Sequence, residues 1–273
     1  MSSSAISSTS ELVQTAARAE LLRSLHVPGT PLIVTNVWDA ITARTVAAVP
    51  GVKALATASH AISFAHDVPD GEGLSLDQAL AAASLITHAV DIPVSVDFER
   101  GYARDVAALE HNIARLIATG AAGLNIEDTV DAAAGQLFPL EIATARVAAV
   151  RETARTVGVP LVINARVDTL VRGGEWNDMV QRANSYLGAG ADVIFVLGLD
   201  TEEKVTRALE EIDGKVSVIS GATSVPLKRL AELGVSRVSF GGRPLGLTLA
   251  HLQRTAAQLT ALGDYPQELG FDY

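Results

Sequence analysis

The feature that most constrains the fold of this chain is an alternation, repeated eight times, between a short apolar run and a longer segment with helical spacing. The short runs are rich in Val, Ile, Leu and Ala, and Gly, Pro or polar residues bound them. They are Pro31–Asn36, Ala54–Ser59, Pro93–Phe98, Gly123–Asp128, Pro160–Arg166, Val193–Gly198, Lys215–Ser220 and Arg237–Gly242. We predict that each run is a buried strand of a parallel sheet.

The segments after these runs have the apolar spacing of helices. They are Asp39–Ala48, Leu76–Val90, Val106–Thr119, Glu141–Val157, Asn177–Leu187, Glu202–Glu211, Pro226–Leu233 and Leu245–Leu262, and a further helix is predicted at Glu11–Leu25. Eight strand-then-helix units predict an α/β fold, a (β/α)8 TIM barrel with an extra N-terminal helix. We expect one domain, residues 1–273, with residues 1–10 as a loosely attached tail.

The composition narrows the range of partners. The chain has 31 acidic and 21 basic residues, a formal net charge of −10, and this charge repels a phosphate backbone, so we expect no nucleic-acid partner. It has no cysteine, which excludes thiolate nucleophiles and cysteine-bound metals. No apolar run reaches the roughly 20 residues of a membrane span, and the Ser-rich start does not resemble a secretory signal. We expect a cytoplasmic protein without a membrane partner.

Acidic residues cluster where the third and fourth predicted strands end, which is where functional groups of a barrel project. Asp97 and Glu99 are two residues apart, so on a strand both would face the barrel mouth. Glu127 ends the neighbouring strand. Oxygen ligands without His or Cys favour Mg2+ or Mn2+ over Zn2+. We therefore predict a metal site at Asp97, Glu99 and Glu127.

Basic residues near these acids leave an alternative open. The acids could instead form structural ion pairs with Arg100, Arg104 and Arg166. Arg166 ends the fifth predicted strand, where a guanidinium can also hold a substrate carboxylate through two parallel hydrogen bonds. His60 and His66 follow the second strand and could transfer protons near neutral pH. None of the four lysines ends a predicted strand, which disfavours a Schiff-base aldolase.

A set of short motifs at these strand ends resembles the isocitrate lyase/phosphoenolpyruvate mutase superfamily. The resemblance extends from about Pro31 to Leu262. The motifs are Asn36-Val-Trp-Asp39-Ala40, Ala56-Thr-Ala-Ser59, Pro69-Asp70-Gly71, Asp97-Phe-Glu99-Arg-Gly101, Gly123-Leu-Asn-Ile-Glu127-Asp128 and Asn164-Ala-Arg166. Their order and their positions at strand ends together make the resemblance specific.

The resemblance implies a Mg2+-dependent enzyme that acts on a 2-oxo or 2-hydroxy carboxylate through a metal-stabilised enolate. Asp97 would be the principal metal ligand, with the other acids, Asp70 among them, in the outer sphere. Arg166 would bind a carboxylate, and Ser59 with the amides that follow would hold the oxo-acid end. The implied substrate-binding set is Thr57, Ser59, His60, Ala61, Asp70 and Arg166, and the implied catalytic set is Asp97, Glu127, Arg166 and Ser59. It also implies a homo-oligomer, a dimer or tetramer, in which the last helix packs on a neighbouring subunit.

The chain departs from the family in the segment Thr129–Pro139, which lacks the Cys of the lyases and the Lys and Asn of the mutases. Three hypotheses therefore remain open. The first is a lyase that breaks a C–C bond beside a carbonyl, which includes oxaloacetate decarboxylation. The second is C–P chemistry on phosphonopyruvate, as a hydrolase or a phosphoenolpyruvate mutase. The third is a barrel that binds a metabolite without converting it. The small residues of Thr129–Pro139 also suggest a mobile lid.

Overall fold

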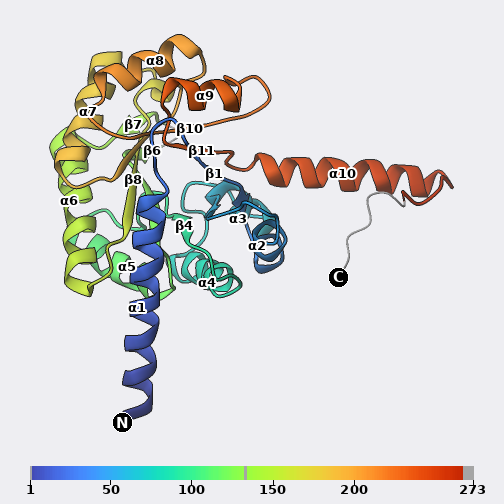
Figure 1. Cartoon of the computed structure of the whole chain (residues 1–273), viewed down its shortest axis with the longest axis horizontal. Coiled ribbons are helices and arrows are strands. Elements are labelled where there is room, and N and C mark those ends of the chain that lie inside the picture. Colours follow the sequence, from blue (N-terminus) through green and yellow to red (C-terminus); the bar gives the residue numbers. More distant parts are fainter. Residues whose placement is uncertain (1, 132–133, 267–273) are drawn as a thin grey trace.

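Parallel strands form a closed barrel in the computed structural model of the chain, which describes residues 2–131 and 134–266 (Figure 1). The barrel strands are β1 (Leu32–Val34), β2 (Asn36–Val37), β3 (Leu55–Thr57), β4 (Val94–Asp97), β5 (Gly123–Glu127), β8 (Val162–Val167), β9 (Val193–Val196), β10 (Val216–Ile219) and β11 (Arg237–Ser239). Every pairing between them is parallel. These nine segments occupy the eight strand positions that the sequence predicts, and the TIM-barrel fold is confirmed.

The barrel closes at its first strand, which is split between Val34 and Asn36. The lower part, β1, pairs with β11, whereas the upper part, β2, pairs with β3. One strand position therefore joins the two ends of the sheet. Closure of this kind leaves no free sheet edge and directs the C-terminal ends of all the strands to one mouth.

Helices surround the barrel and connect its strands. They are α1 (Ser2–Ser24), α2 (Ala40–Ala47), α3 (Ser59–Ala65), α4 (Leu76–Thr87), α5 (Val106–Ala118), α6 (Leu140–Val157), α7 (Trp176–Gly188), α8 (Glu202–Glu211), α9 (Leu227–Leu233) and α10 (Arg243–Thr260). Local signals explain several boundaries. Asp39 and Ser75 accept from the N3 amides of α2 and α4 as N-caps, and Gly158 ends α6 with a left-handed φ of 80°.

Helix α1 packs against the base of the barrel, opposite the mouth. Leu22 is fully buried, and a Cβ added at Gly123 of β5 would lie 2.9 Å from its side chain. Arg23 binds the Asp192 carboxylate and the Pro160 carbonyl, both at 2.9 Å. The end of α1 therefore seals the barrel floor, and its remainder extends away from the barrel (Figure 1).

Helix α10 projects sideways from the body of the molecule in Figure 1 instead of lying along the barrel wall. Leu245, in its first turn, is buried, but Leu247, Leu249, Leu252 and Leu259 are exposed. The eighth helix of this barrel therefore does not cover its own barrel.

The structure adds elements that the sequence analysis did not predict. These are α3, the short 3-10 helix Leu170–Arg172, and an antiparallel pair formed by β6 (Thr129–Asp131) and β7 (Gln136–Leu137). The pair lies within the predicted lid, and residues 132 and 133 of that lid lie outside the described residues. Helix α1 begins at Ser2, so Ser2–Ser10, expected to be a loose tail, continue the helix. No helix in the described part of the chain is long and apolar enough to cross a membrane.

Candidate active site

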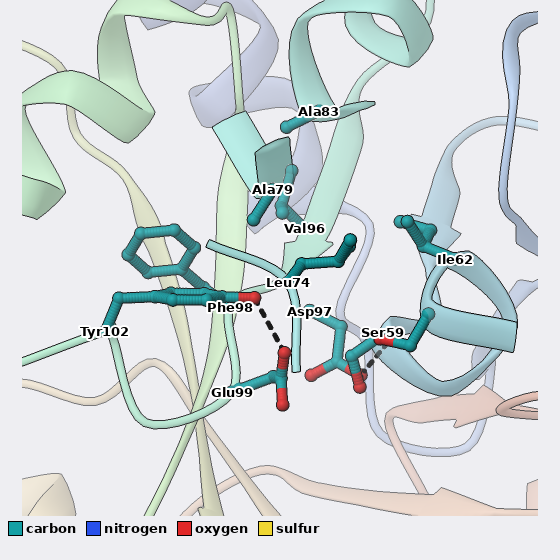
Figure 2. Close-up of a pocket in the computed structure, with 11 residues that line it drawn as sticks. Ser59, Ile62, Leu74, Ala79, Ala83, Val96, Asp97, Phe98, Glu99 and Tyr102 are labelled. Atoms are coloured by element: carbon teal, nitrogen blue, oxygen red, sulfur yellow. Dashed lines mark hydrogen bonds between the residues drawn. The ribbon is translucent and has the colours of Figure 1, made fainter. Parts of the chain in front are cut away.

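Asp97 is the central acid of the barrel mouth and ends β4. Its Oδ2 accepts hydrogen bonds from the Ser59 amide at 3.0 Å and the Ser59 hydroxyl at 2.9 Å. Its own amide donates to the Thr57 hydroxyl at 2.8 Å. No hydrogen bond from the described residues reaches Oδ1, which points into a hollow (Figure 2). Strand β3 and helix α3 thus hold Asp97 firmly while one carboxylate oxygen stays available.

Glu99 reaches the same hollow by a route that corrects the sequence argument. Strand β4 ends at Asp97, and Glu99 has a left-handed φ of 49°, so strand alternation does not determine its direction. The tight turn after the strand places the two carboxyl groups side by side (Figure 2). Burial raises the pKa of Glu99 to about 7; the Tyr102 hydrogen bond opposes this shift, and the charge of Asp97 adds to it.

Glu72 fastens the loop that carries Glu99. The Glu99 carboxylate accepts from the Tyr102 hydroxyl at 2.7 Å and from the Glu72 amide. The Glu72 carboxylate in turn accepts from the Tyr102 amide at 2.8 Å and from Arg100 at 3.0 Å. The Pro69–Gly73 loop and the loop after β4 are therefore locked together. Glu72 was not among the predicted site residues, although its position directly after the Asp70-Gly71 motif was a usable signal.

Two cavities meet at this point. The hollow itself has a volume of about 10 Å3, enough for one ion or water, and its walls include Ser59, Asp97, Glu99 and Tyr102 (Figure 2). A larger open cavity of about 860 Å3 lies beside it and shares Leu74 and Tyr102 with it. Leu74 and Tyr102 therefore form a wall common to the hollow and the open cavity.

Arg166 forms the other side of the mouth. It lies opposite Glu127 in the register of β5 and β8, and its Nη1 is 2.6 Å from Glu127 Oε2. Its Nε and Nη2 bind both oxygens of Asp168, at 2.7 and 2.9 Å. The structural pairing of Arg166 with Glu127, one of the two roles predicted, is present. Asp168 completes the fork, a partner that the sequence analysis did not predict.

One guanidinium is shared between two buried carboxyl groups, so negative charge is in excess. Burial raises the pKa of Glu127; Arg166 opposes this shift, while Asp168 and Asp97 add to it. Thr129 donates to Asp168 at 2.6 Å, and the Asp168 amide donates to Asp128 at 3.0 Å. This network connects Arg166 to the base of the β6–β7 pair.

The predicted substrate-binding residues take different places. Thr57 is fully buried and supports Asp97 from behind, so it does not face the mouth, contrary to our expectation. Ala61 is buried in a small apolar cluster with Ala58 and Leu245, so only its backbone can face a ligand. His60 and Asp70 are exposed at the rim, with His60 Nδ1 3.8 Å from Asp70 Oδ2.

The donor set fits a hard divalent cation that keeps most of its water. Within residues 2–131 and 134–266, no three His, Cys, Asp or Glu side chains converge as a complete metal cage. Mg2+ commonly takes one or two carboxylates and retains several waters. The available oxygen of Asp97, the adjacent hollow and the raised pKa values of Glu99 and Glu127, whose ionised forms a nearby cation would favour, suit such an ion. The roles of these residues as ligands stay a prediction.

Comparison with known proteins gives one consistent family. The family model described as phosphoenolpyruvate phosphomutase matches residues 22–260. An uncharacterised protein of Mycobacterium tuberculosis is 31% identical, with 85% of this chain and 87% of that protein covered. An oxaloacetate decarboxylase of Pseudomonas putida is 27% identical over 80% of this chain and 76% of the relative. A phosphoenolpyruvate phosphomutase of Streptomyces viridochromogenes is 26% identical over 89% and 80%.

This chain is also similar to solved structures of proteins with related names. A candidate lyase/mutase of Burkholderia cenocepacia is 30% identical and superposes with a TM-score of 0.87, covering 95% of this chain and 94% of that one. A phosphonopyruvate hydrolase, solved with oxalate and Mg2+, shares the fold at 21% identity, with a TM-score of 0.79 and 90% and 88% of the chains covered.

Proposed function

Because the chain belongs to the phosphoenolpyruvate phosphomutase family, within the isocitrate lyase/phosphoenolpyruvate mutase superfamily of enzymes, we propose that it is a Mg2+-dependent lyase that breaks a C–C bond in a small 2-oxo or 2-hydroxy carboxylate. The observation that supports this proposal is the arrangement of the acidic and basic side chains at the barrel mouth. Asp97 presents one carboxylate oxygen to a hollow that Glu99 shares, and Arg166 lies on the neighbouring side. A relative that decarboxylates oxaloacetate supports this class of substrate.

In this proposal Asp97 holds the cation directly, and Glu99 and Glu127 hold it through water. A bound Mg2+ supplies a Lewis acid that polarises the keto group and offsets the negative charge that grows on it as the bond breaks. The hard oxygen chemistry of the three acids matches Mg2+, with Mn2+ as a substitute.

The remaining residues position the substrate. The Arg166 guanidinium can exchange part of its contact with Glu127 for a substrate carboxylate, to which it offers a planar fork of donors. Ser59 starts α3, where helix geometry leaves the first amides without intrahelical acceptors. These amides, of His60 and Ala61, can donate to the oxo-acid end. Thr57 keeps Asp97 in place.

The proposal is tested by a combined screen of thermal stability and turnover with and without Mg2+. Oxaloacetate, dimethylmalate, methylisocitrate and phosphonopyruvate are the substrates, and oxalate is the unreactive ligand. We expect pyruvate or another 2-oxo acid from a C–C substrate, and no product from Asp97→Ala. Asp77→Asn is the matched control, because Asp77 forms only a surface ion pair, at 2.5 Å with Arg115. Unchanged turnover in Asp97→Ala would contradict the proposed site.

Other outcomes of the same screen separate the remaining hypotheses. Phosphate release from phosphonopyruvate, with no C–C product, would assign the second hypothesis, C–P chemistry. Stabilisation by oxalate and Mg2+ without any product would favour a binding role or an untested substrate. No effect of Mg2+ on stability or turnover would disprove the metal site.

We also propose that the protein works as a homo-oligomer in which α10 packs on a second copy. Leu249, Leu252 and Leu259 lie on one stripe of α10 at helical spacing, and all three are exposed in the single chain. An exposed apolar stripe on a projecting helix is typical of an interface. Light scattering on the purified protein should give a mass above the 28.4 kDa of one chain.

A further inference from the structure

Arg237 is a fully buried arginine inside the barrel, and the proposed function gives it no role. We propose that Arg237 is the internal counter-charge of Asp97 and that it sets the affinity of the mouth for a divalent cation. The second half of this inference rests on the proposed function, because it concerns the proposed metal site. The first half, the pairing with Asp97, can be tested without any metal.

The Arg237 side chain crosses the interior of the barrel. Arg237 is the first residue of β11, where it pairs with Ser217 of β10 and Leu32 of β1. Its Nη1 donates to the Ser95 hydroxyl of β4 at 3.2 Å. Strand β3 and the split first strand lie between β11 and β4 in the sheet, so this hydrogen bond spans the interior instead of linking neighbouring strands. The guanidinium therefore lies inside the barrel, beside β4.

The contact with Ser95 places the guanidinium beneath the mouth. Ser95 and Asp97 are two residues apart on β4, so their side chains face the same way. Asp97 lies roughly 7 Å nearer the C-terminal end of the strand, the rise of two strand residues. The Arg237 charge is therefore one layer below the Asp97 carboxylate, on the same face of the same strand.

Arg237 lacks a contacting carboxylate among the described residues. Its Nε and Nη2 find no hydrogen-bond acceptor there, and Nη1 reaches only the neutral Ser95 hydroxyl. A buried charge of this kind is costly unless an opposite charge compensates for it. Burial lowers the pKa of Arg237 to about 10, and the Asp97 carboxylate opposes this shift. The guanidinium thus stays protonated at neutral pH, with Asp97 as the acid whose charge acts on it.

The described residues at the floor of the barrel provide no compensating charge. His26 lies on that side, directly after the end of α1. Burial lowers the pKa of His26 to about 3, and Arg237 adds to this shift, so the imidazole is neutral at neutral pH. The Asp192 carboxylate near His26 is already bound by Arg23 and Arg151, at 2.9 and 2.5 Å. The compensation for Arg237 therefore comes from the mouth.

An interior cation has two opposite effects on the mouth. Without a bound metal it offsets part of the negative charge that the acids Asp97, Glu99 and Glu127 place there. With a divalent cation bound at Asp97 it opposes that ion, because two cations then compete for the same carboxylate. Such interactions are stronger in a barrel interior than in water. We therefore expect loss of Arg237 to destabilise the metal-free protein but to tighten the binding of Mg2+.

The pairing is tested by a double-variant cycle without metal. Arg237→Gln removes the charge but can still donate to Ser95, and Arg237→Met removes both. In EDTA at pH 8, each should lower the urea midpoint of the wild type. In an Asp97→Asn background this loss should disappear, because the guanidinium has already lost its counter-charge. Equal losses in both backgrounds would overturn the pairing.

Two further variants show whether the effect is specific. Arg237→Lys keeps the interior charge and should behave like the wild type in both backgrounds. Arg151→Met is the matched control, because Arg151 also loses a carboxylate, Asp192, but binds at the floor end of the strands. Its loss should be the same with and without Asp97→Asn, since distant sites contribute additively. A loss that depends on the background here as well would overturn the assignment to Arg237.

The effect on affinity is tested by titrating Mg2+ at pH 8 and following the thermal midpoint. Both charge-free variants should reach a given rise in midpoint at about 10-fold lower Mg2+ than the wild type. Arg237→Lys and Arg151→Met should titrate like the wild type. A purely structural role for Arg237 would weaken the binding of Mg2+. Equal or weaker binding in the charge-free variants would therefore overturn this half of the inference.

Failure of this inference and failure of the proposed function would look different. A wild type that does not respond to Mg2+ would disprove the metal site and, with it, the effect of Arg237 on affinity. The cycle in EDTA would still decide whether Arg237 balances Asp97. Normal stabilisation of the wild type by Mg2+, with no gain in affinity in the charge-free variants, would leave the proposed lyase intact and overturn the role of Arg237 in affinity.

Discussion

At the level of single residues, the candidate site contains more negative charge than its own cations balance. Arg166 forms ion pairs with both Glu127 and Asp168, whose side chains are 10% and 0% exposed. Buried charges are tolerated when they are paired and hydrogen-bonded, and removing one partner leaves the others uncompensated. Arg166 therefore has a structural role as well as its proposed contact with substrate.

Replacement of Arg166 by Met should lower both stability and substrate affinity. We expect a loss of about 3–5 kcal/mol in the free energy of unfolding, the usual cost of breaking a buried ion pair, measured by urea denaturation. Arg155→Met is the control, since Arg155 pairs with Glu152 in a fully solvated i,i+3 pair and its loss should leave the midpoint unchanged. Equal midpoints for the two variants would show that the fork around Arg166 contributes little.

Glu99 gives a pH dependence whose sign can be derived. Burial raises its pKa from 4.5 to about 7, so between these pH values the folded protein holds a proton that the unfolded chain has lost. The free energy of unfolding of the metal-free protein should therefore fall as pH rises from about 4.5 to about 7. Thermal melts across this range, with and without EDTA, measure it.

Glu99→Gln removes one of the buried carboxyl groups with a raised pKa and should make this pH profile less steep, while Glu127 continues to contribute. Glu203→Gln is the control, because Glu203 lies on the exposed side of α8 and should leave the profile as in the wild type. Added Mg2+ should stabilise the wild type more at pH 8 than at pH 5, since ionised carboxylates are its ligands. A profile that rises from pH 5 to pH 7 in EDTA would contradict the burial of an ionisable Glu99.

At the level of elements, the sequence predicts the parts of the fold whose periodicity is strong. All eight strand positions and the helices that follow them are present, because short apolar runs and amphipathic helices carry their own signal. Helix α3 was missed because Ser59–Ala65 is only seven residues long and its small, polar start resembles a loop. The β6–β7 pair was missed because its strands are only three and two residues long, too short for an alternating pattern to show.

The candidate site, like the fold, was predictable from the sequence only in part. Strand ends pointed to Asp97, Glu127 and Arg166, since a barrel brings its strand ends together. The left-handed turn at Glu99 and the burial of Thr57 depend on contacts between loops that periodicity does not encode. The sequence could therefore indicate which residues gather at the mouth, but not which of them support the others.

Helix α1 offers a test of the separation between the base of the barrel and its mouth. Leu22→Ala should cost about 2–5 kcal/mol in unfolding free energy, because it leaves a cavity beside Gly123 at the fully buried floor. Leu21→Ala is the control on the same helix, where the side chain is 48% exposed. Both variants should keep wild-type turnover at temperatures where they are folded. A large loss of turnover in folded Leu22→Ala would show that floor and mouth are coupled.

At the level of the whole molecule, α10 is the helix on which the proposed homo-oligomer depends. Its stripe of Leu249, Leu252 and Leu259 faces solvent in the isolated chain, and apolar surface of this kind drives association.

Leu252→Asp should shift the protein toward the monomer in light scattering, because a carboxylate would have to be buried at the interface. His251→Asp is the control, because it introduces an aspartate at the adjacent exposed position. This variant should keep the wild-type mass. An unchanged mass for Leu252→Asp would disprove the role of this stripe.

The start of α10 also touches the mouth, since Gly242, its N-cap, lies against His60. In the proposed homo-oligomer, α10 would be anchored at the mouth by one end and packed on a second copy along its length, and so would link catalysis to association. Dilution of the proposed oligomer would remove the packing partner of the 18 residues of α10, loosen the rim of the mouth at Gly242 and lower the rate per molecule. The specific activity of this enzyme would then depend on how much of the enzyme is present, so a cell could adjust it through protein abundance, with no effector molecule required.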